Sequence, residues 1–365
     1  MKKLGFGCMR LPLKVKKINS SIDLEKTKEM VDYFINEDFT YFDTAYMYHD
    51  GRSEKAVREA VVHRYNREKF LLADKMPVGM LVTKGDTSRI FRHQLKKCGT
   101  EYFDYYLLHA LNAKYLERAE KLGVFEYLAK KKSEGKIRKL GFSFHDSAEV
   151  LDRILTRHPD MEFVQLQINY LDWEDEKVQS RLCYEVARKH GKDIIVMEPV
   201  KGGKLADVPE KVKELFASEH PDWSPASWAV RFCAGLPGVI CVLSGMSDMA
   251  QLKDNTGYMK NFEPLTEKEL GIVKTAAAII NNKETIPCTV CRYCTSVCPM
   301  NIAIPEYFTA YNMKLSAEGS PEEYLRENAA GKGKAADCIN CRKCEEMCPQ
   351  HIAVTEKLAL AAKTF

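Results

Sequence analysis

Tyr41-Phe42-Asp43-Thr44-Ala45-Tyr46-Met47-Tyr48 is an apolar run that ends in a carboxylate, with a phenol five residues further on. Its aromatic start predicts a buried strand at residues 40–43, and the change at Asp43 predicts that a loop begins there. The same order of events, an apolar run followed by a helical pattern, recurs along the chain. The other seven apolar runs lie at residues 4–9, 70–73, 103–108, 137–142, 163–168, 193–197 and 239–243.

Strands that alternate with helices pair in parallel, because a parallel crossover needs a connection of helix length. Eight such units in about 260 residues match a closed (β/α)8 barrel, the TIM barrel, in number and in size. The longest of the intervening helices are expected at residues 115–134 and 175–190. The alternative is an open doubly wound sheet, but Gly5-Phe6-Gly7 lacks the rest of the phosphate-binding fingerprint of that fold.

The barrel pattern ends before the last quarter of the chain. Thr266 and Glu269 have the spacing of a capping box, which predicts one more helix that ends at Asn281-Asn282-Lys283. Composition then shifts to cysteine and proline, so we place the domain boundary there. The predicted units are a barrel over residues 1–265, a connecting helix over 266–285 and a small, mostly helical domain over 286–365, with helices at 304–315 and 321–328.

Composition excludes several classes of function. The chain of 365 residues is 45% hydrophobic and 29% charged, which is typical of a soluble globular protein. Its net charge of +4 comes without a basic block, so no nucleic-acid partner is expected. No apolar run reaches membrane-spanning length, and no secretory segment is recognised at the start. An odd count of 13 cysteines argues against a secreted disulfide framework and favours the cytoplasm.

Polar side chains stand at the ends of three neighbouring predicted strands. Asp43 ends the second strand, Tyr48 lies on the loop after it, Lys75 follows the third strand, and His109 follows the fourth. Catalytic residues of a (β/α)8 barrel lie at the carboxyl ends of its strands, so all four would share one rim. Each residue alone has an ordinary interpretation, as a cap, a surface aromatic, a solvent-facing lysine and a core histidine. Because all four residues are predicted at the same rim of the barrel, a catalytic site is the favoured interpretation.

The four residue types form a consistent acid catalyst. A tyrosine has a pKa of about 10, and a neighbouring ammonium is expected to lower it. Asp43 would pair with Lys75 and hold it in place, while His109 would hydrogen-bond the oxygen of a substrate. Such a site donates a proton to a carbonyl oxygen while a hydride attacks the carbon.

Asp43-Thr44-Ala45-x-x-Tyr48, the strand ending in Lys75, and Tyr105-Tyr106-Leu107-Leu108-His109 resemble the aldo/keto reductase superfamily. The resemblance covers roughly residues 4–260. It implies a (β/α)8 barrel in which Asp43, Tyr48, Lys75 and His109 are the catalytic tetrad and NADP or NAD delivers the hydride. The nicotinamide contacts that it implies are Gly7, Cys8, Met9, Asp43, Ser143, Gln165, Met197, Pro199, Gly202, Ser244, Gly245, Gln251 and Asn255.

This sequence departs from the family at several of these contacts. Phe144 stands where an asparagine is expected, and Met197 replaces the aromatic on which the nicotinamide stacks. Gly245 and Gln251 occupy the positions where relatives that use NADPH carry cations for the 2′-phosphate. Lys201 or Lys204 is expected to compensate, and the choice between NADH and NADPH stays open.

The motif Cys-x2-Cys-x2-Cys-x3-Cys-Pro, the ligand pattern of bacterial ferredoxins, occurs twice. In such a pair the fourth cysteine of each run binds the other cluster, which predicts two [4Fe-4S] clusters. Zinc is the alternative, but it explains neither the third cysteine spacing nor the Cys-Pro ending. The 39 residues between the runs resemble an all-helical ferredoxin arrangement. The predicted ligand sets are Cys288, Cys291, Cys294 and Cys348 for one cluster, and Cys338, Cys341, Cys344 and Cys298 for the other.

Three functional hypotheses follow. In the first, the chain reduces a small aldehyde or ketone with NAD(P)H and its clusters transfer electrons, with a redox protein as a further partner. In the second, it is an electron-transfer protein whose barrel is a binding scaffold. In the third, the clusters are structural. Tyr46, Met47 and Trp173 are expected to line the substrate mouth. The dispersed cysteines Cys8, Cys98, Cys183, Cys233 and Cys241 are expected in the core.

Overall fold

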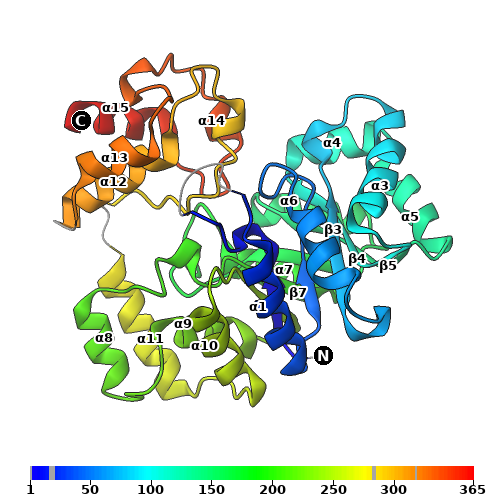
Figure 1. Cartoon of the computed structure of the whole chain (residues 1–365), viewed down its shortest axis with the longest axis horizontal. Helices are drawn as coiled ribbons and strands as arrows, with labels where there is room; N and C mark the ends of the chain where they lie inside the picture. Colours follow the sequence, from blue (N-terminus) through cyan, green and yellow to red (C-terminus); the bar gives the residue numbers. More distant parts are fainter. Residues whose placement is uncertain (1, 16–20, 282–284, 317–318) are drawn as a thin grey trace.

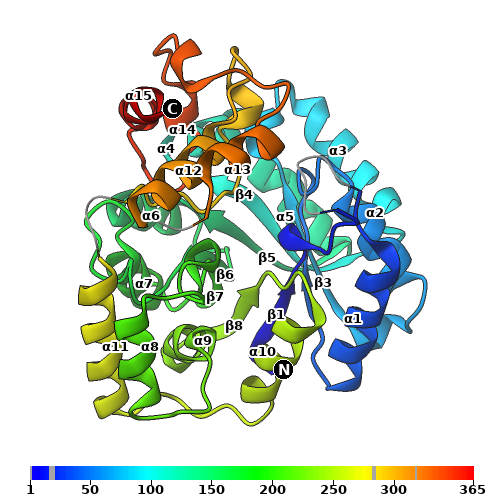
Figure 2. The ribbon, with the colours of Figure 1, turned by 60° about the vertical axis from the view of Figure 1, so that its left-hand side comes forward.

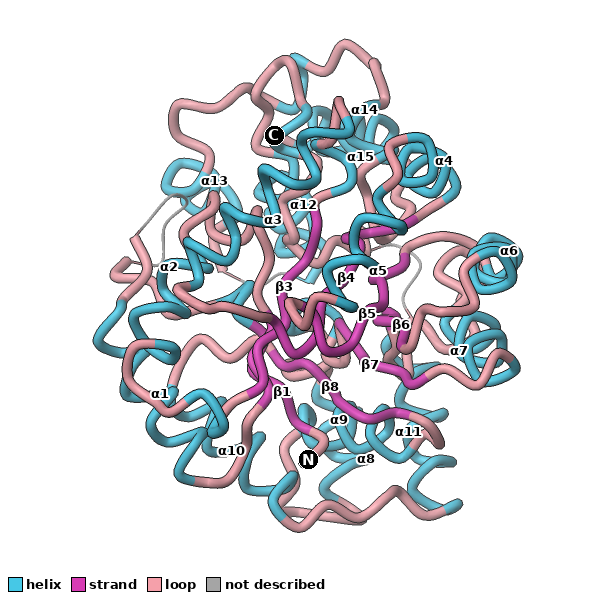
Figure 3. The backbone as a smooth tube through the Cα atoms, turned by 90° about the vertical axis from the view of Figure 1, so that its right-hand side faces the viewer, coloured by secondary structure: helices cyan, strands magenta, loops and turns pink. Residues whose placement is uncertain are grey.

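The computed structural model describes residues 2–15, 21–281, 285–316 and 319–365. Within these residues, eight parallel strands pair in chain order and close into a barrel, as predicted (Figure 3). The family of open doubly wound sheets is thereby excluded, because β8 pairs directly with β1. The strands are β1 (Leu4–Gly7), β2 (Tyr41–Asp43), β3 (Leu71–Met76), β4 (Phe103–Leu111), β5 (Ile137–Phe144), β6 (Phe163–Gln167), β7 (Asp193–Met197) and β8 (Val239–Ser244).

Helices follow the strands around the outside of the barrel (Figure 1). The first of them is capped by the side chain of Asp23, which accepts a hydrogen bond from the Lys26 amide. The helices of the barrel are α1 (Leu24–Asn36), α2 (Ser53–Val57), α3 (Lys84–Cys98), α4 (Ala113–Lys121), α5 (Val124–Ser133), α6 (Ala148–Arg157), α7 (Ser180–Lys189), α8 (Glu210–Ala217), α9 (Pro225–Gly235) and α10 (Met249–Lys260).

Two helix predictions were wrong in their bounds. The helix expected at residues 115–134 is the pair α4 and α5, because Gly123 between them adopts a left-handed conformation with φ of 68°. The helix expected at 175–190 begins only at Ser180. The Asp175 carboxylate instead binds the amides of Lys177 and Val178 in a turn that keeps the preceding residues out of the helix.

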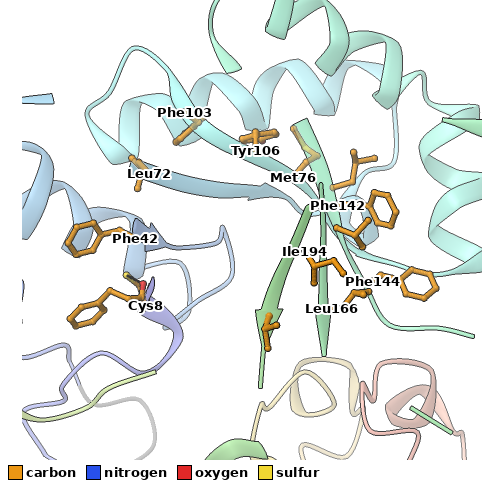
Figure 4. Packing of buried hydrophobic residues seen from close by; sticks show 14 of the residues in the cluster. Cys8, Phe42, Leu72, Met76, Phe103, Tyr106, Phe142, Phe144, Leu166 and Ile194 are labelled. Atoms are coloured by element: carbon orange, nitrogen blue, oxygen red, sulfur yellow. Dashed lines mark hydrogen bonds between the residues drawn. The ribbon is translucent and has the colours of Figure 1, made fainter. Parts of the chain in front are cut away.

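The core has two layers. One fills the barrel interior and includes Tyr41, Leu107 and Phe163. The other lies between strands and helices, where Phe42 and Leu72 pack among other buried side chains (Figure 4). All five dispersed cysteines are buried, as predicted: Cys8, Cys98, Cys183, Cys233 and Cys241.

The helix α11 (Glu267–Ile280) packs against α8 and begins with the predicted capping box of Thr266 and Glu269. Part of the predicted domain boundary, Asn282 and Lys283, lies outside the described residues. The chain then forms a helical domain that sits over the carboxyl ends of the barrel strands (Figure 2). Its helices are α12 (Ile304–Ser316), α13 (Pro321–Asn328), α14 (Lys343–Glu346) and α15 (Val354–Thr364).

The helices α12 and α13 match the predicted ones, whereas α15 was not predicted. Its Val354, Leu358 and Ala361 belong to a separate apolar cluster of this domain, and several cysteines pack at the edge of that cluster. In the part of the chain that the structure describes, no helix combines the length and the apolar character needed to cross a membrane.

Candidate functional site

The structure brings Asp43, Tyr48, Lys75 and His109 together at one end of the barrel. The Lys75 side chain is fully buried, and its ammonium donates hydrogen bonds to Asp43 Oδ1 at 2.6 Å and to the Thr44 carbonyl oxygen at 2.7 Å. The same ammonium lies 4.9 Å from the centre of the Tyr48 ring. The rings of Tyr48 and His109 meet edge to face with their centres 6.1 Å apart.

The pKa of Tyr48 is shifted in the direction opposite to the expected one. Burial raises the pKa of Tyr48 well above its ordinary value, and the negative charge of Asp43 raises it further. The prediction that the pKa of Tyr48 is lowered was therefore wrong for the net effect, because burial and the charge of Asp43 outweigh the positive charge of Lys75 at the ring. Burial also lowers the pKa of His109 far below its ordinary value, so its imidazole is neutral at pH 7.

A cavity of about 600 Å³ opens above these residues. Cys8 is the exception among the predicted contacts, since its side chain is 1% exposed and lies beside Phe42 in the outer core layer (Figure 4). The other predicted contacts all line the cavity: Gly7, Met9, Asp43, Ser143, Gln165, Met197, Pro199, Gly202, Ser244, Gly245, Gln251 and Asn255.

Two acceptor atoms in the cavity fit a nicotinamide nucleoside. Gln165 Oε1 and Asp43 Oδ2 are buried and have no hydrogen-bond partner within the described residues. Ser143 Oγ accepts a hydrogen bond from the Ala110 amide at 2.8 Å, so its own proton is free to be donated. A carboxamide and a ribose hydroxyl would satisfy these groups, because a buried acceptor without a partner is costly.

The far end of the cavity corrects another prediction. Lys201 is buried and ion-paired with Asp172, and Lys204 lies 3.3 Å from Thr285, so neither lysine lines the cavity. The guanidinium in the lining belongs to Arg10, which packs over Gly245. The sequence pattern gave no reason to choose Arg10, because it follows the first strand and approaches Gly245 only through barrel closure.

The structure brings together the four cysteines of the first predicted group and three of the second. A narrow cavity is lined by Cys288, Cys291, Cys294 and Cys348, although Cys348 comes from the second run. In the other group, Cys344 is close enough to Cys338 and Cys298 for both to contribute to its raised pKa, and Cys341 is exposed. Four thiols gathered as in the first group suit an iron–sulfur cluster, since such a cluster requires four sulfur ligands.

The cysteine loops also form the roof of the large cavity. The ring of Tyr293 meets that of His109 edge to face with their centres 6.2 Å apart, and its side chain lies close enough to Tyr48 to lower the pKa of that phenol. Gln350 exchanges two hydrogen bonds with Gln167 of β6, at 2.9 and 3.1 Å. The roof residues are Thr289, Cys291, Tyr293, Pro349 and Gln350.

The mouth of the cavity is lined by the roof residues of the cysteine loops and not by the barrel-loop residues that were predicted there. Tyr46 packs against His93, and Trp173 packs against Tyr184 and Phe232, so neither lines the cavity, and Met47 does not line it either. That prediction was wrong because it assumed that barrel loops alone would shape the mouth.

Comparison with known proteins identifies a family for each of two parts of the chain. Residues 3–278 match the aldo/keto reductase family, and residues 287–354 match a 4Fe-4S dicluster domain. The chain belongs to the aldo/keto reductase family. It is an oxidoreductase of this family with a 4Fe-4S dicluster domain at its carboxyl-terminal end.

One curated relative is the uncharacterized oxidoreductase YqkF of Bacillus subtilis (strain 168), which is 26% identical over 299 residues, or 73% of this chain and 90% of the relative. Two solved structures share the fold. The aldo-keto reductase of Bacillus halodurans in its holo form is 24% identical with a TM-score of 0.61, covering 75% of this chain and 91% of that one. An aldo-keto reductase from Klebsiella pneumoniae in complex with NADPH is 19% identical with a TM-score of 0.58, covering 75% and 90%.

Proposed function

We propose that the protein reduces a small aldehyde or ketone with NAD(P)H, with Tyr48 as the proton donor. The observation that carries the proposal is the position of the assembled tetrad directly beneath a cavity of about 600 Å³. The unpaired acceptors Gln165 Oε1 and Asp43 Oδ2 support a nicotinamide nucleoside as one occupant of that cavity. When bound, the nicotinamide supplies the hydride that the carbonyl carbon receives.

Each tetrad residue has a separate part in the proton transfer. Tyr48 keeps its proton at neutral pH because its pKa is raised, so it is ready to protonate the carbonyl oxygen. His109 is neutral and donates a hydrogen bond to the same oxygen. Lys75, held by Asp43, places its positive charge at the ring of Tyr48 and favours the phenolate that remains after the transfer.

We further propose that the two groups of cysteine thiolates each hold a [4Fe-4S] cluster. The clusters supply one-electron transfer when bound. Cys291 lines both the narrow cavity and the large one, which supports a role for the first cysteine group in the reaction of the bound molecule.

A second candidate function is electron transfer to or from a molecule in the cavity without nicotinamide turnover. Glu198 favours it. Its carboxylate lines the cavity beside the segment expected to flank the pyrophosphate, and its Oε2 has no partner within the described residues. A carboxylate at this place repels a pyrophosphate unless it is protonated or displaced, and burial does raise the pKa of Glu198.

Anaerobic purification followed by titration with NADH and NADPH separates the two candidates. We expect Tyr48→Phe to lower kcat for carbonyl reduction by at least about 100-fold with unchanged nucleotide affinity. Tyr46→Phe, on the same loop but outside the cavity, is the matched control and should retain activity. Wild-type turnover in Tyr48→Phe would refute the proton-donor role. Failure of both nucleotides to bind the intact protein would favour the second candidate.

A further inference from the structure

Tyr293 lines the large cavity above Tyr48 and His109, although its sequence position is inside a cysteine motif. It lies between Cys291 and Cys294, far in sequence from the tetrad. Its ring nevertheless contacts that of His109 at an interplanar angle of 83°, and the ring of Tyr48 meets the same imidazole edge to face. An aromatic residue of the carboxyl-terminal domain thus touches His109 and lines the same cavity as Tyr48.

The side chain of Tyr293 acts against the other influences on the pKa of Tyr48. Burial and the charges of Asp43 and Glu198 all raise the pKa of Tyr48, whereas the side chain of Tyr293 lowers it. Lys75 lies over the ring of Tyr48, but its hydrogen bonds go to Asp43 and Thr44 and not to the Tyr48 oxygen. Tyr293 therefore offers the Tyr48 phenolate a stabilising group in addition to the ammonium of Lys75.

The loop that carries Tyr293 is held firmly against the barrel. Arg10 Nη2 donates a hydrogen bond to the carbonyl oxygen of Thr289 at 2.7 Å, and the Thr289 side chain is 3% exposed. Gly202 approaches Thr289 so closely that a Cβ atom at residue 202 would lie 2.8 Å from the Thr289 Cα. These contacts fix the loop beside Tyr48, so the position of the Tyr293 phenol is determined by packing.

We propose that Tyr293 is a positioning residue of the reductase site, whose hydroxyl donates a hydrogen bond to the Tyr48 oxygen and stabilises the phenolate left after proton transfer. This inference rests on the proposed carbonyl reduction. The proton that reaches the carbonyl oxygen is that of Tyr48, Tyr293 retains its own, and solvent restores the proton of Tyr48 before the next turnover. The cysteine-bearing domain thereby takes part in acid catalysis through its polypeptide, independently of electron transfer.

The test compares Tyr293→Phe with Tyr307→Phe, a partly buried tyrosine of the same domain that packs away from the cavity. We expect Tyr293→Phe to lower kcat by about tenfold with KM within about twofold, since a hydrogen bond to a charged group is lost. Iron content and cluster absorbance should match wild type in both variants. An unchanged kcat and pH profile in Tyr293→Phe would overturn the proposal.

A second measurement does not depend on turnover. Protein labelled with 3-fluorotyrosine is titrated by ¹⁹F NMR, with the Tyr48 resonance assigned by its absence in Tyr48→Phe. We expect Tyr48 to ionise at higher pH in Tyr293→Phe than in wild type or Tyr307→Phe. Equal titration in all three proteins refutes the role of Tyr293 even if carbonyl reduction is confirmed. A shift in a protein without nicotinamide turnover supports the contact and rejects only the proposed function.

Discussion

The two cysteine runs have identical spacing but occupy different environments. The first run packs into the mouth of the barrel, where Cys291 and Tyr293 line the large cavity. In the second run, Cys341 is exposed and Ile339 is 60% exposed, and only the end of this run reaches the barrel. The spacing of the motif thus determines which cysteines come together. The packing of the cysteine domain on the barrel determines whether a cysteine group lies next to the cavity or next to solvent. The first cysteine group adjoins the large cavity through Cys291, whereas the second group exposes Cys341 to solvent.

The largest difference is expected between Cys291→Ser and Cys341→Ser, which remove equivalent ligands from the two groups. Each variant should lose about four of roughly eight irons per chain, measured by iron and sulfide analysis. Only Cys291→Ser should also weaken nicotinamide binding, by about tenfold, because Cys291 forms part of the cavity wall. Equal losses of nucleotide affinity in the two variants would show that the asymmetry has no functional consequence.

Gly202→Ala is expected to destabilise the packing of the first cysteine run against the barrel at Thr289. Gly202 and Gly191 have nearly equal φ values of 67° and 66°, but a Cβ atom meets Thr289 only at residue 202. Both substitutions introduce backbone strain, and Gly202→Ala should destabilise by a further ~1–3 kcal/mol through the clash. Urea unfolding measures the difference, and Gly191→Ala is the control. Equal urea midpoints for the two variants would show that the loop at Thr289 moves to accommodate the added methyl group without loss of stability.

Acidification is expected to lower the stability of the fold through His145, which lies close to His351 after the second cysteine run. Burial, followed by the proximity of His351, lowers the pKa of His145 to about 4. Because the unfolded chain binds this proton from about pH 6.5 downward, stability falls as pH decreases from 6.5 toward 4, by about 1 kcal/mol at pH 5.5. Urea unfolding at pH 7.5 and 5.5 tests this, and His145→Gln should reduce the pH dependence. A dependence of the same size in His145→Gln would assign it to other groups.

The smallest effect is expected at the outer edge of the second run. Lys114 of α4 pairs with Glu346 at 2.6 Å, and their side chains are 62% and 59% exposed. Lys114→Ala should change stability by less than about 1 kcal/mol, and high salt should remove the difference. Lys131→Ala, which breaks the Glu134 pair on the barrel, is a matched control. A loss well above that of the control would show that the second run also depends on its docking contacts.

Local patterns were sufficient for much of the fold and the site. The alternation of apolar runs and helical segments predicted the barrel, and strand ends located Asp43, Lys75 and His109. Predictions failed where backbone conformation depended on a single residue, as at Gly123, or where a polar side chain redirected the chain, as at Asp175. They also failed at the cavity mouth, since Tyr46 and Trp173 were assigned to it without regard to the second domain.

The sequence by itself determined the eight units, the tetrad residues and the two cysteine motifs, because burial periodicity and short ligand spacings are written in nearby residues. Only the tertiary structure decided that Tyr293 and Gln350 roof the cavity and that Arg10, and not Lys201, lines it. The hydrogen bonds from Arg10 to Thr289 and from Gln350 to Gln167 join residues 279 and 183 positions apart. Contacts at such separations follow no period, so they arise only when the closed barrel and the cysteine domain pack together.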